Sequence, residues 1–193
     1  HDSIYLGEDG PTHQPVEHLM SLRLIPGVDV IRPANSIEVQ YAYQYIFTKS
    51  NNPKSLVLTR QSLDYVETNL SYKNFQEGAY ELIKGDDITI FASGSEVSLA
   101  IEVSKKLKNK SVQIISTPIL NQVNTDTLTN LKINEFVFTL ELGRSIGWQD
   151  YIGKVTESFS IETFGKSAPQ EDLTNYFEFS AEKIAEKILQ HIS

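Results

Sequence analysis

The sequence predicts an α/β protein in which two units follow one another along the chain. Short apolar runs alternate with stretches of helical periodicity, and a polar stretch over residues 60–87 interrupts this alternation. Apolar residues make up 40% of the 193 residues, which is typical of a chain with a buried core. Alternating strands and helices indicate a mostly parallel sheet. We therefore expect a three-layer α/β domain after the interruption, preceded by the partial tail of a second α/β domain.

Two helices and two strands are expected before the interruption. A short helix follows Pro15, which a first helical turn tolerates, and a brief apolar strand covers residues 28–31. Asn35 precedes Glu38 by three residues, a spacing typical of a capped helix start. The run SLVLT at residues 55–59 is expected to form a buried strand parallel to the first one.

After the interruption the alternation becomes regular. Strands are expected at residues 88–92, 112–116, 136–140 and 159–163. Helices are expected at 96–108, after each of the last two strands, and from Ser180 onward. We interpret residues 60–87 as the connection between the domains, and we assign residues 1–73 and 74–193 to the two domains.

The early unit is too small to stand alone. Two strands and two helices cannot cover both faces of a parallel sheet. The chain also begins at His1, with neither Met nor a capping signal. We therefore expect residues 1–73 to be the tail of a larger domain, and the chain to be a fragment or one product of a divided polypeptide.

Charge and composition exclude several classes of protein. The net charge is −8 and no basic cluster occurs, which argues against nucleic acid as a partner. The chain has no cysteine, which excludes disulfides and thiolate chemistry and favours a non-secreted protein. No apolar run is long enough to span a membrane and no signal peptide is present, so a cytoplasmic location is expected.

The opening run HDSIYLGEDGPTHQP concentrates reactive side chains in a loop. His1 and His13 lie in it together with Asp2, Glu8 and Asp9, between glycines and a proline. A solvated surface turn is the usual role of such a loop. Histidine close to carboxylates, with glycines that let a ligand approach the backbone, also fits an active site. A zinc site is disfavoured, because further close-spaced ligands are missing.

Longer motifs decide between these two interpretations. DSIYLGEDGPTHQP resembles the DSIGLGEDGPTHQP signature of transketolases. The resemblance continues through SLRLIPGVDVIRPAN, LVLTRQSL, ASGSEVSLAI and TFGKSAP, in that order and over essentially the whole chain. Two departures are Tyr5, where the family commonly has glycine, and Thr59, where serine is common. Tyr5 is expected to narrow the channel for the donor sugar.

The resemblance implies an activity and a set of site residues. Transketolases use thiamine diphosphate to move a two-carbon ketol group from a ketose phosphate to an aldose phosphate, in the pentose phosphate pathway. His13 matches the histidine that assists proton transfer and stabilises the oxyanion. Asp9 matches the aspartate that binds the C2 hydroxyl of the sugar. His1 and Arg60 match ligands of the terminal phosphate.

Arg60 also fits this role without the resemblance. It follows the predicted strand 55–59, and open parallel sheets bind ligands at the carboxyl ends of their strands. A planar guanidinium is well suited to a phosphate. The alternative for Arg60 is a surface or interdomain salt bridge.

The resemblance also implies what this chain lacks. The family's cofactor-activating glutamate, its aromatic residues on the cofactor ring, and the domain that binds the diphosphate and Mg²⁺ (or Ca²⁺) all precede the residue that matches His1. We expect no bound cofactor, no metal ion and no ketol transfer in the isolated chain. The family forms homodimers, so the partner is a second copy or an upstream transketolase half. Two alternatives are a non-catalytic interaction or regulatory module and one subunit of a split enzyme.

Two later features have mainly structural interpretations. The turn SGSEV places Ser93 and Ser95 at a helix start, where anion binding is possible, but helix capping explains the serines more simply. Trp148, the one tryptophan, is expected to pack in a core or an interface.

Overall fold

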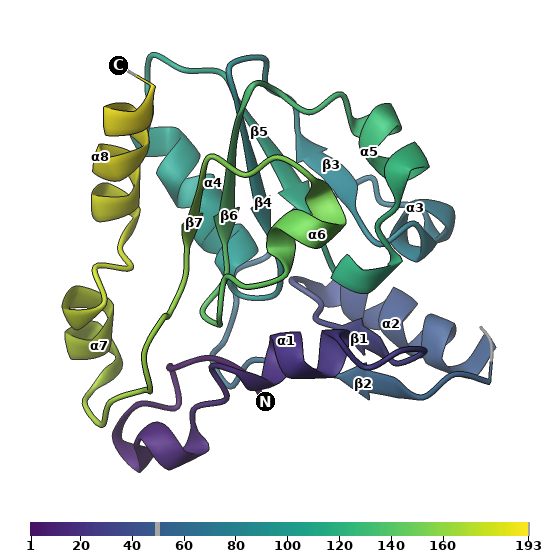
Figure 1. Cartoon of the computed structure of the whole chain (residues 1–193), viewed down its shortest axis with the longest axis horizontal. Coiled ribbons are helices and arrows are strands. Elements are labelled where there is room, and N and C mark those ends of the chain that lie inside the picture. Colours follow the sequence, from purple (N-terminus) through teal and green to yellow (C-terminus); the bar gives the residue numbers. More distant parts are fainter. Residues whose placement is uncertain (49–50, 193) are drawn as a thin grey trace.

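The computed structural model describes residues 1–48 and 51–192, which form two sheets (Figure 1). The first sheet contains β1 (Asp29–Ile31) and β2 (Lys54–Leu56), which pair in parallel with Val30 opposite Ser55. The helices α1 (His18–Arg23) and α2 (Ser36–Thr48) belong to the same early unit. The expected order of two helices and two strands is confirmed, and so is the Asn35 cap, whose Oδ1 accepts a hydrogen bond from Glu38 N at 3.0 Å.

The second strand is shorter than the sequence predicts. Its ladder ends at Leu56, although Val57 N still donates to Ile31 O at 2.8 Å. The neighbouring strand ends at Ile31 because Arg32 and Pro33 turn away into the boundary with the later unit. Residues 57–59 therefore have no strand beside them to pair with.

The later unit is a five-stranded sheet in the order β3-β5-β4-β6-β7. Its strands are β3 (Tyr80–Ile83), β4 (Ile88–Ala92), β5 (Val112–Ser116), β6 (Phe136–Leu140) and β7 (Glu157–Phe159). All neighbours pair in parallel except β3, which runs antiparallel to β5 at the edge. Three expected strands have the predicted bounds, whereas β7 ends where the strand 159–163 was expected to begin.

Residues 60–87 are not simply a connection, and this prediction is wrong in its second half. They contain α3 (Tyr72–Gln76) and β3. Ser71 Oγ caps α3 by accepting from Asn74 N, and Phe75 is fully buried. A polar helix of five residues carries little periodicity, and β3 is held by its pairing with β5 rather than by its own pattern.

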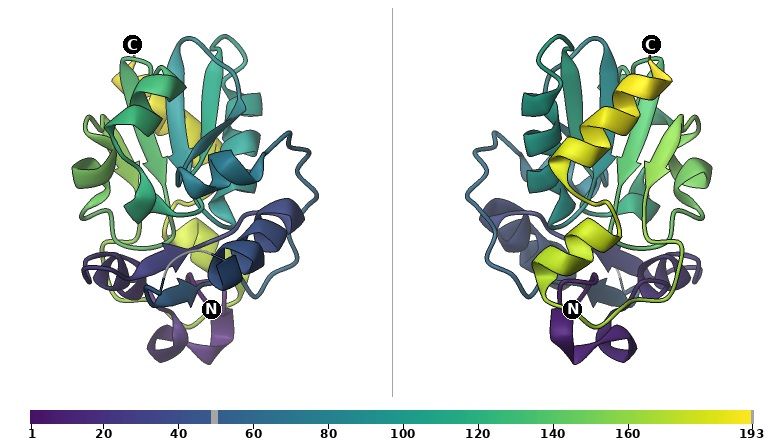
Figure 2. Two further views of the ribbon diagram at one scale, coloured as in Figure 1. Left: turned by 90° about the vertical axis from the view of Figure 1, so that its right-hand side faces the viewer. Right: turned by 90° about the vertical axis from the view of Figure 1, so that its left-hand side faces the viewer.

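Helices cover both faces of the later sheet (Figures 1 and 2). On one face, α4 (Glu96–Lys106) and α8 (Ala181–His191) enclose a core that includes Ile90 of β4. On the other face, α5 (Thr125–Leu131) and α6 (Trp148–Ile152) enclose a core that includes Phe91. Alternate residues of one strand thus enter different cores, as the pleat of a strand requires. The three-layer prediction is confirmed.

The opening segment lies at the boundary between the two units. It forms two short 3-10 turns, η1 (Gly7–Asp9) and η2 (Pro11–His13), and η1 lies beside α7 (Gln170–Tyr176) of the later unit (Figure 2). Ile4 and Val16, on either side of the turns, are fully buried in the core that also contains α4 and α8. The loop is therefore anchored at both ends.

Candidate functional site

The opening segment presents its predicted site residues to solvent. His1, Asp9 and His13 are all exposed. Gly10 separates the two 3-10 turns and has φ +88°, a conformation that favours glycine. The backbone between Asp9 and His13 therefore turns sharply enough to display both side chains at the surface.

His1 and His13 border the same hollow, which has a volume of about 530 Å³. His1 Nε2 donates a hydrogen bond to the His13 backbone oxygen at 2.8 Å. His13 Nδ1 lies 3.0 Å from Thr12 Oγ1. These contacts leave Nδ1 of His1 and Nε2 of His13 as the ring nitrogens available to a ligand. The lining residues are His1, Pro11, Thr12, His13, Gln14, Pro15, His18 and Phe164.

Asp9 and Arg60 are not among the residues that line this hollow. Asp9 ends η1, and Arg60 is exposed four positions after the end of β2. The segment around Arg60 is nevertheless attached to the opening segment, because Gln61 Nε2 donates to Tyr5 O at 2.6 Å. The structure thus brings His1 and His13 together, and it brings the backbone next to Arg60 up to the same loop.

A clamp joins the opening segment to residues 165–167 of the later unit. Gln14 Nε2 donates to Lys166 O at 2.8 Å, and Lys166 N donates back to Gln14 Oε1 at 3.0 Å. Gly165 is needed here, because a Cβ atom on it would lie 2.0 Å from Gln14 Oε1. Ser167 Oγ adds a hydrogen bond to Glu8 O at 2.8 Å. The TFGKSAP motif therefore holds the loop that carries His13.

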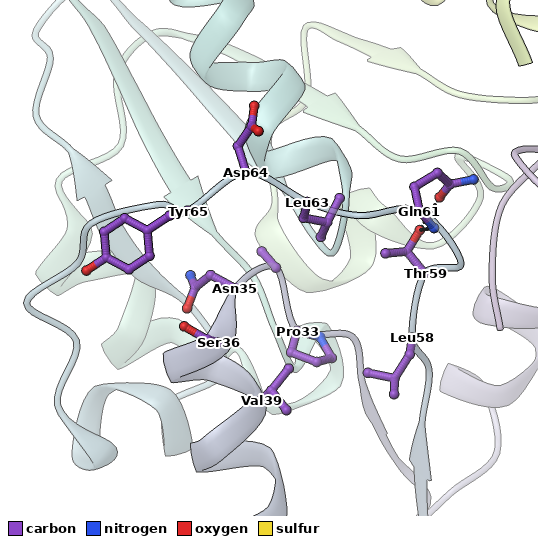
Figure 3. Close-up of a pocket in the computed structure, with 11 residues that line it drawn as sticks. Pro33, Asn35, Ser36, Val39, Leu58, Thr59, Gln61, Leu63, Asp64 and Tyr65 are labelled. Carbon is purple, nitrogen blue, oxygen red and sulfur yellow. Dashed lines mark hydrogen bonds between the residues drawn. The ribbon is translucent and has the colours of Figure 1, made fainter.

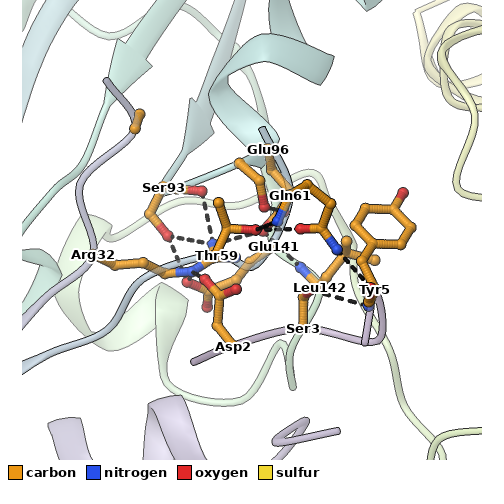
Figure 4. Close-up of polar contacts among 12 residues, drawn as sticks. Asp2, Ser3, Tyr5, Arg32, Thr59, Gln61, Ser93, Glu96, Glu141 and Leu142 are labelled. Carbon is orange, nitrogen blue, oxygen red and sulfur yellow. Dashed lines mark hydrogen bonds and ion pairs between the residues drawn. The ribbon is translucent and has the colours of Figure 1, made fainter. Parts of the chain in front are cut away.

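A buried ionic cluster holds Asp2, the residue after His1 (Figure 4). Arg32 Nε donates to Asp2 Oδ2 at 2.5 Å, and Arg32 Nη1 pairs with Glu96 Oε2 at 2.5 Å. Because Asp2 adjoins His1, this ion pair fixes the start of the opening segment against the later unit. We call the group the Arg32 cluster; its members are Asp2, Arg23, Arg32, Ser93, Glu96 and Glu141.

Glu141, at the end of β6, joins the second arginine to the Arg32 cluster. Its carboxylate accepts two hydrogen bonds from Arg23, at 2.7 and 2.8 Å, in a bidentate pair. Ser93 Oγ and Trp148 Nε1 also donate to it, at 2.6 and 2.9 Å. One carboxylate thus connects α1 of the early unit with α6 and the β4 turn of the later unit.

The charges of the Arg32 cluster shift the pKa values of its members. Burial disfavours the ionised form of Glu141, but Arg23 and Arg32 outweigh burial and lower its pKa to about 2. Burial raises the pKa of Glu96, and Arg32 only partly offsets this. Burial also opposes the charge of Arg32, yet the surrounding carboxylates outweigh burial and raise its pKa. Three acids thus face two guanidinium groups in the Arg32 cluster.

Three further expectations can be compared with the structure. Neither Ser93 nor Ser95 caps α4: the first donates to Glu141 and the second to Glu96 Oε1 at 2.5 Å. The Tyr5 ring does not border the hollow of His1. It lines a separate hollow beside α4, and its hydroxyl accepts from Thr174 Oγ1 at 3.4 Å. Trp148 packs in a core, as predicted.

A second hollow, of about 450 Å³, lies between the start of α2 and residues 58–65 (Figure 3). Pro33, Val39, Leu58 and Leu63 give it an apolar wall. None of the four predicted site residues lines it.

Beside the second hollow, Glu38 is fully buried. It accepts hydrogen bonds from Ala34 N at 2.7 Å, from Ser116 Oγ at 2.6 Å and from Tyr80 hydroxyl at 2.8 Å. Burial raises the pKa of Glu38 despite these donors. Glu38 therefore joins α2 to β3 and β5 of the later unit.

Within residues 1–48 and 51–192, no three His, Asp or Glu side chains lie close enough together to hold a metal ion. Over the same residues, no helix combines the length and the apolar character needed to cross a membrane.

Sequence reasoning missed three residues that shape the site. His18 lines the hollow from the first position of α1, Phe164 lines it from the later unit, and Arg32 holds the segment in place. His18 follows His13 by five residues and could have been noticed from that spacing. Phe164 and Arg32 lie inside motifs of the resemblance but carry no signal of their own, because their neighbours in space are distant in sequence.

The fold defines an α/β protein whose opening segment lies at the boundary between two sheets. Residues 1–65 match the family described as the transketolase pyrimidine-binding domain. Residues 78–180 match the transketolase-like C-terminal domain. The chain therefore belongs to the transketolase family.

Individual relatives agree with this assignment. The transketolase of Aquifex aeolicus is 35% identical over 206 residues, which cover 98% of this chain and 29% of the relative. Transketolase 1 of Candida albicans is 39% identical over 195 residues, which cover 97% of this chain and 28% of the relative. The chain thus spans less than a third of the length of these relatives.

Solved structures show the same relationship. Transketolase from Leishmania mexicana matches with a TM-score of 0.88 and 32% identity, over 98% of this chain and 29% of that one. A transketolase variant from Pichia stipitis, solved in complex with fructose 6-phosphate, matches with a TM-score of 0.89 and 33% identity, over 100% of this chain and 29% of that one. A split-gene transketolase, described as an inactive β4 tetramer, shares the fold, with a TM-score of 0.80 and 17% identity over 94% of this chain and 62% of that one.

Proposed function

We propose that this chain is the sugar-phosphate-binding part of a transketolase, which transfers a two-carbon ketol group from a ketose phosphate to an aldose phosphate. The observation that carries the proposal is the hollow that His1 and His13 both line. A hydrogen bond of 2.8 Å from His1 Nε2 to the backbone oxygen of His13 joins the two residues. Two exposed imidazoles on one wall can bind a phosphate and handle a proton.

Each predicted residue has a role in this proposal. His13, whose Nε2 remains available, assists proton transfer at the reacting carbonyl and stabilises the oxyanion. His1 and Arg60 bind the terminal phosphate, and Arg60 does so as a cationic hydrogen-bond donor. Asp9 accepts a hydrogen bond from the C2 hydroxyl of the sugar. The Gln14 clamp and the Arg32 cluster hold the loop that carries these side chains.

The residues that the structure describes offer no site for the cofactor's metal ion. The described part of the chain has no group of three metal-binding side chains, so no step is assigned here to Mg²⁺ or to the diphosphate. In this proposal, thiamine diphosphate and its metal ion are held by residues outside this chain, in the upstream half of the enzyme. We therefore expect no ketol transfer by the 193-residue chain alone. A cytoplasmic location of the enzyme is a separate part of the proposal.

The proposal is tested by measuring the affinity for fructose 6-phosphate. The 193-residue chain is titrated with this ligand, and amide shifts in the NMR spectrum give the dissociation constant. Arg60→Ala should weaken binding about tenfold or more, because a charge-assisted contact to phosphate is lost. Lys110→Ala removes the same charge from an exposed loop after α4 and should leave the affinity unchanged. Equal affinities of Arg60→Ala and the unsubstituted chain would contradict the assignment of Arg60.

A further inference from the structure

Phe164 is an exposed aromatic side chain that borders the hollow of His1 and His13. It is 59% exposed, although a phenylalanine gains free energy by leaving water. It comes from the later unit, in the segment between β7 and α7, whereas the other lining residues belong to residues 1–18. The later unit thus supplies one wall of the hollow.

The backbone on both sides of Phe164 is held in place. Before it, the backbone oxygen of Glu162 accepts a hydrogen bond from Arg144 Nη1 at 2.8 Å, and the Glu162 carboxylate accepts one from Ser145 N at 2.9 Å. After it, the Gln14 clamp fixes Gly165 and Lys166. The exposure of the ring therefore comes from a fixed backbone position and not from a loosely attached loop.

The chemistry of the lining indicates what the ring contacts. His1, Thr12 and His13 offer polar atoms, which suit phosphate and hydroxyl groups. Phe164 adds an exposed aromatic ring to the lining. Small-molecule sites commonly combine an apolar wall with a few polar groups that fix orientation. A sugar phosphate carries C–H groups that such a wall can cover, whereas inorganic phosphate has none.

We propose that Phe164 is a specificity-determining residue that contacts the carbon chain of a sugar phosphate bound at His1 and His13. This inference rests on the proposed function, and it adds that the later unit helps to select the ligand. Phe164 favours phosphorylated sugars over inorganic phosphate, because only the sugar can cover its ring.

The test compares two ligands and four variants of the 193-residue chain. NMR titrations give the affinities of Phe164→Ala, Phe164→Leu, Phe164→Tyr and Phe47→Ala for fructose 6-phosphate and for inorganic phosphate. Phe164→Ala should bind fructose 6-phosphate about fivefold more weakly, the effect of losing one apolar face against a small ligand, and should bind inorganic phosphate unchanged. Phe164→Tyr should keep the affinity. Phe47 is 82% exposed on α2, so its substitution should change neither affinity.

The outcomes separate this inference from the proposed function. If Arg60→Ala weakens binding of fructose 6-phosphate but Phe164→Ala and Phe164→Leu do not, the inference is overturned and the function stands. If Phe164→Ala weakens the binding of fructose 6-phosphate and of inorganic phosphate equally, the substitution disturbs the site as a whole, and the inference about Phe164 is overturned. If the unsubstituted chain does not bind fructose 6-phosphate, both proposals fail. If the alanine variant does not fold, the affinities of Phe164→Leu for the two ligands are compared in the same way.

Discussion

Replacing Arg32 with methionine should destabilise the protein strongly. The side chain of Arg32 is fully buried and is surrounded by the carboxylates of Asp2, Glu96 and Glu141. Methionine keeps much of the volume but removes the charge, so the three acids would face Arg23 alone. Removing one partner of a buried ion pair costs about 3 to 5 kcal/mol, because the remaining charge stays buried and uncompensated. We expect the lower end of this range, about 3 kcal/mol, because Arg23 remains paired with Glu141 at 2.7 Å.

Urea unfolding measures this effect. Circular dichroism and the fluorescence of Trp148, which is buried within the cores, should report the same transition. Lys187→Met is the control: it removes a cation that pairs with Glu178 at 2.8 Å on the surface, and it should change stability far less. A loss below about 1 kcal/mol in Arg32→Met would refute the reasoning, because that is the range of exposed pairs.

Three more predictions concern the contacts that hold the opening segment and the two units together. Arg23 and Arg32 lower the pKa of Glu141 from its ordinary 4.5 to about 2, which corresponds to about 3 kcal/mol of folding stability. This stability is complete above pH 4.5 and is lost as the pH falls toward 2. Glu141→Gln should therefore flatten the acid dependence of the urea midpoint. Burial raises the pKa of Glu38, so stability should fall as pH rises above its ordinary value of 4.5. Glu38→Gln should abolish that decline, since an amide can accept from Ala34 N and donate to the hydroxyls of Ser116 and Tyr80; an unchanged pH slope would count against this account. Gly165→Ala should cost about 2 kcal/mol in thermal unfolding because its Cβ meets Gln14 Oε1, and the cost should disappear when Gln14→Ala is the background; a cost that persists there would disprove the clamp.

Much of the fold can be predicted from the sequence because its central strands are apolar on both faces. β4, β5 and β6 have the expected bounds, since each is buried over all or nearly all of its length and consists mostly of apolar residues. The helix α5 and the strand β3 were missed. The first is short and largely polar, and the second is defined by its pairing with β5.

The site could be predicted only in part. The residues of the opening segment follow from the resemblance, because they lie in one continuous motif. The Arg32 cluster could not be predicted, because Arg32 and Asp2 are 30 positions apart and Arg23 and Glu141 are 118 apart. The place of Phe164 in the site could not be predicted either, since only folding brings it to the hollow that His1 lines. The roles of His1, Asp9, His13 and Arg60 remain predictions.

The most direct test of the account follows the imidazole resonances of the four histidines while fructose 6-phosphate is added. His1 and His13 line the proposed site, whereas His191 pairs with Glu157 at 2.5 Å at the end of α8 and serves as an internal reference. The account predicts that the resonances of His1 and His13 shift with one dissociation constant, that this constant rises in Arg60→Ala, and that His191 does not respond. Shifts of His191 equal to those of His1 and His13, or no shift of any histidine, would contradict the proposed sugar-phosphate site.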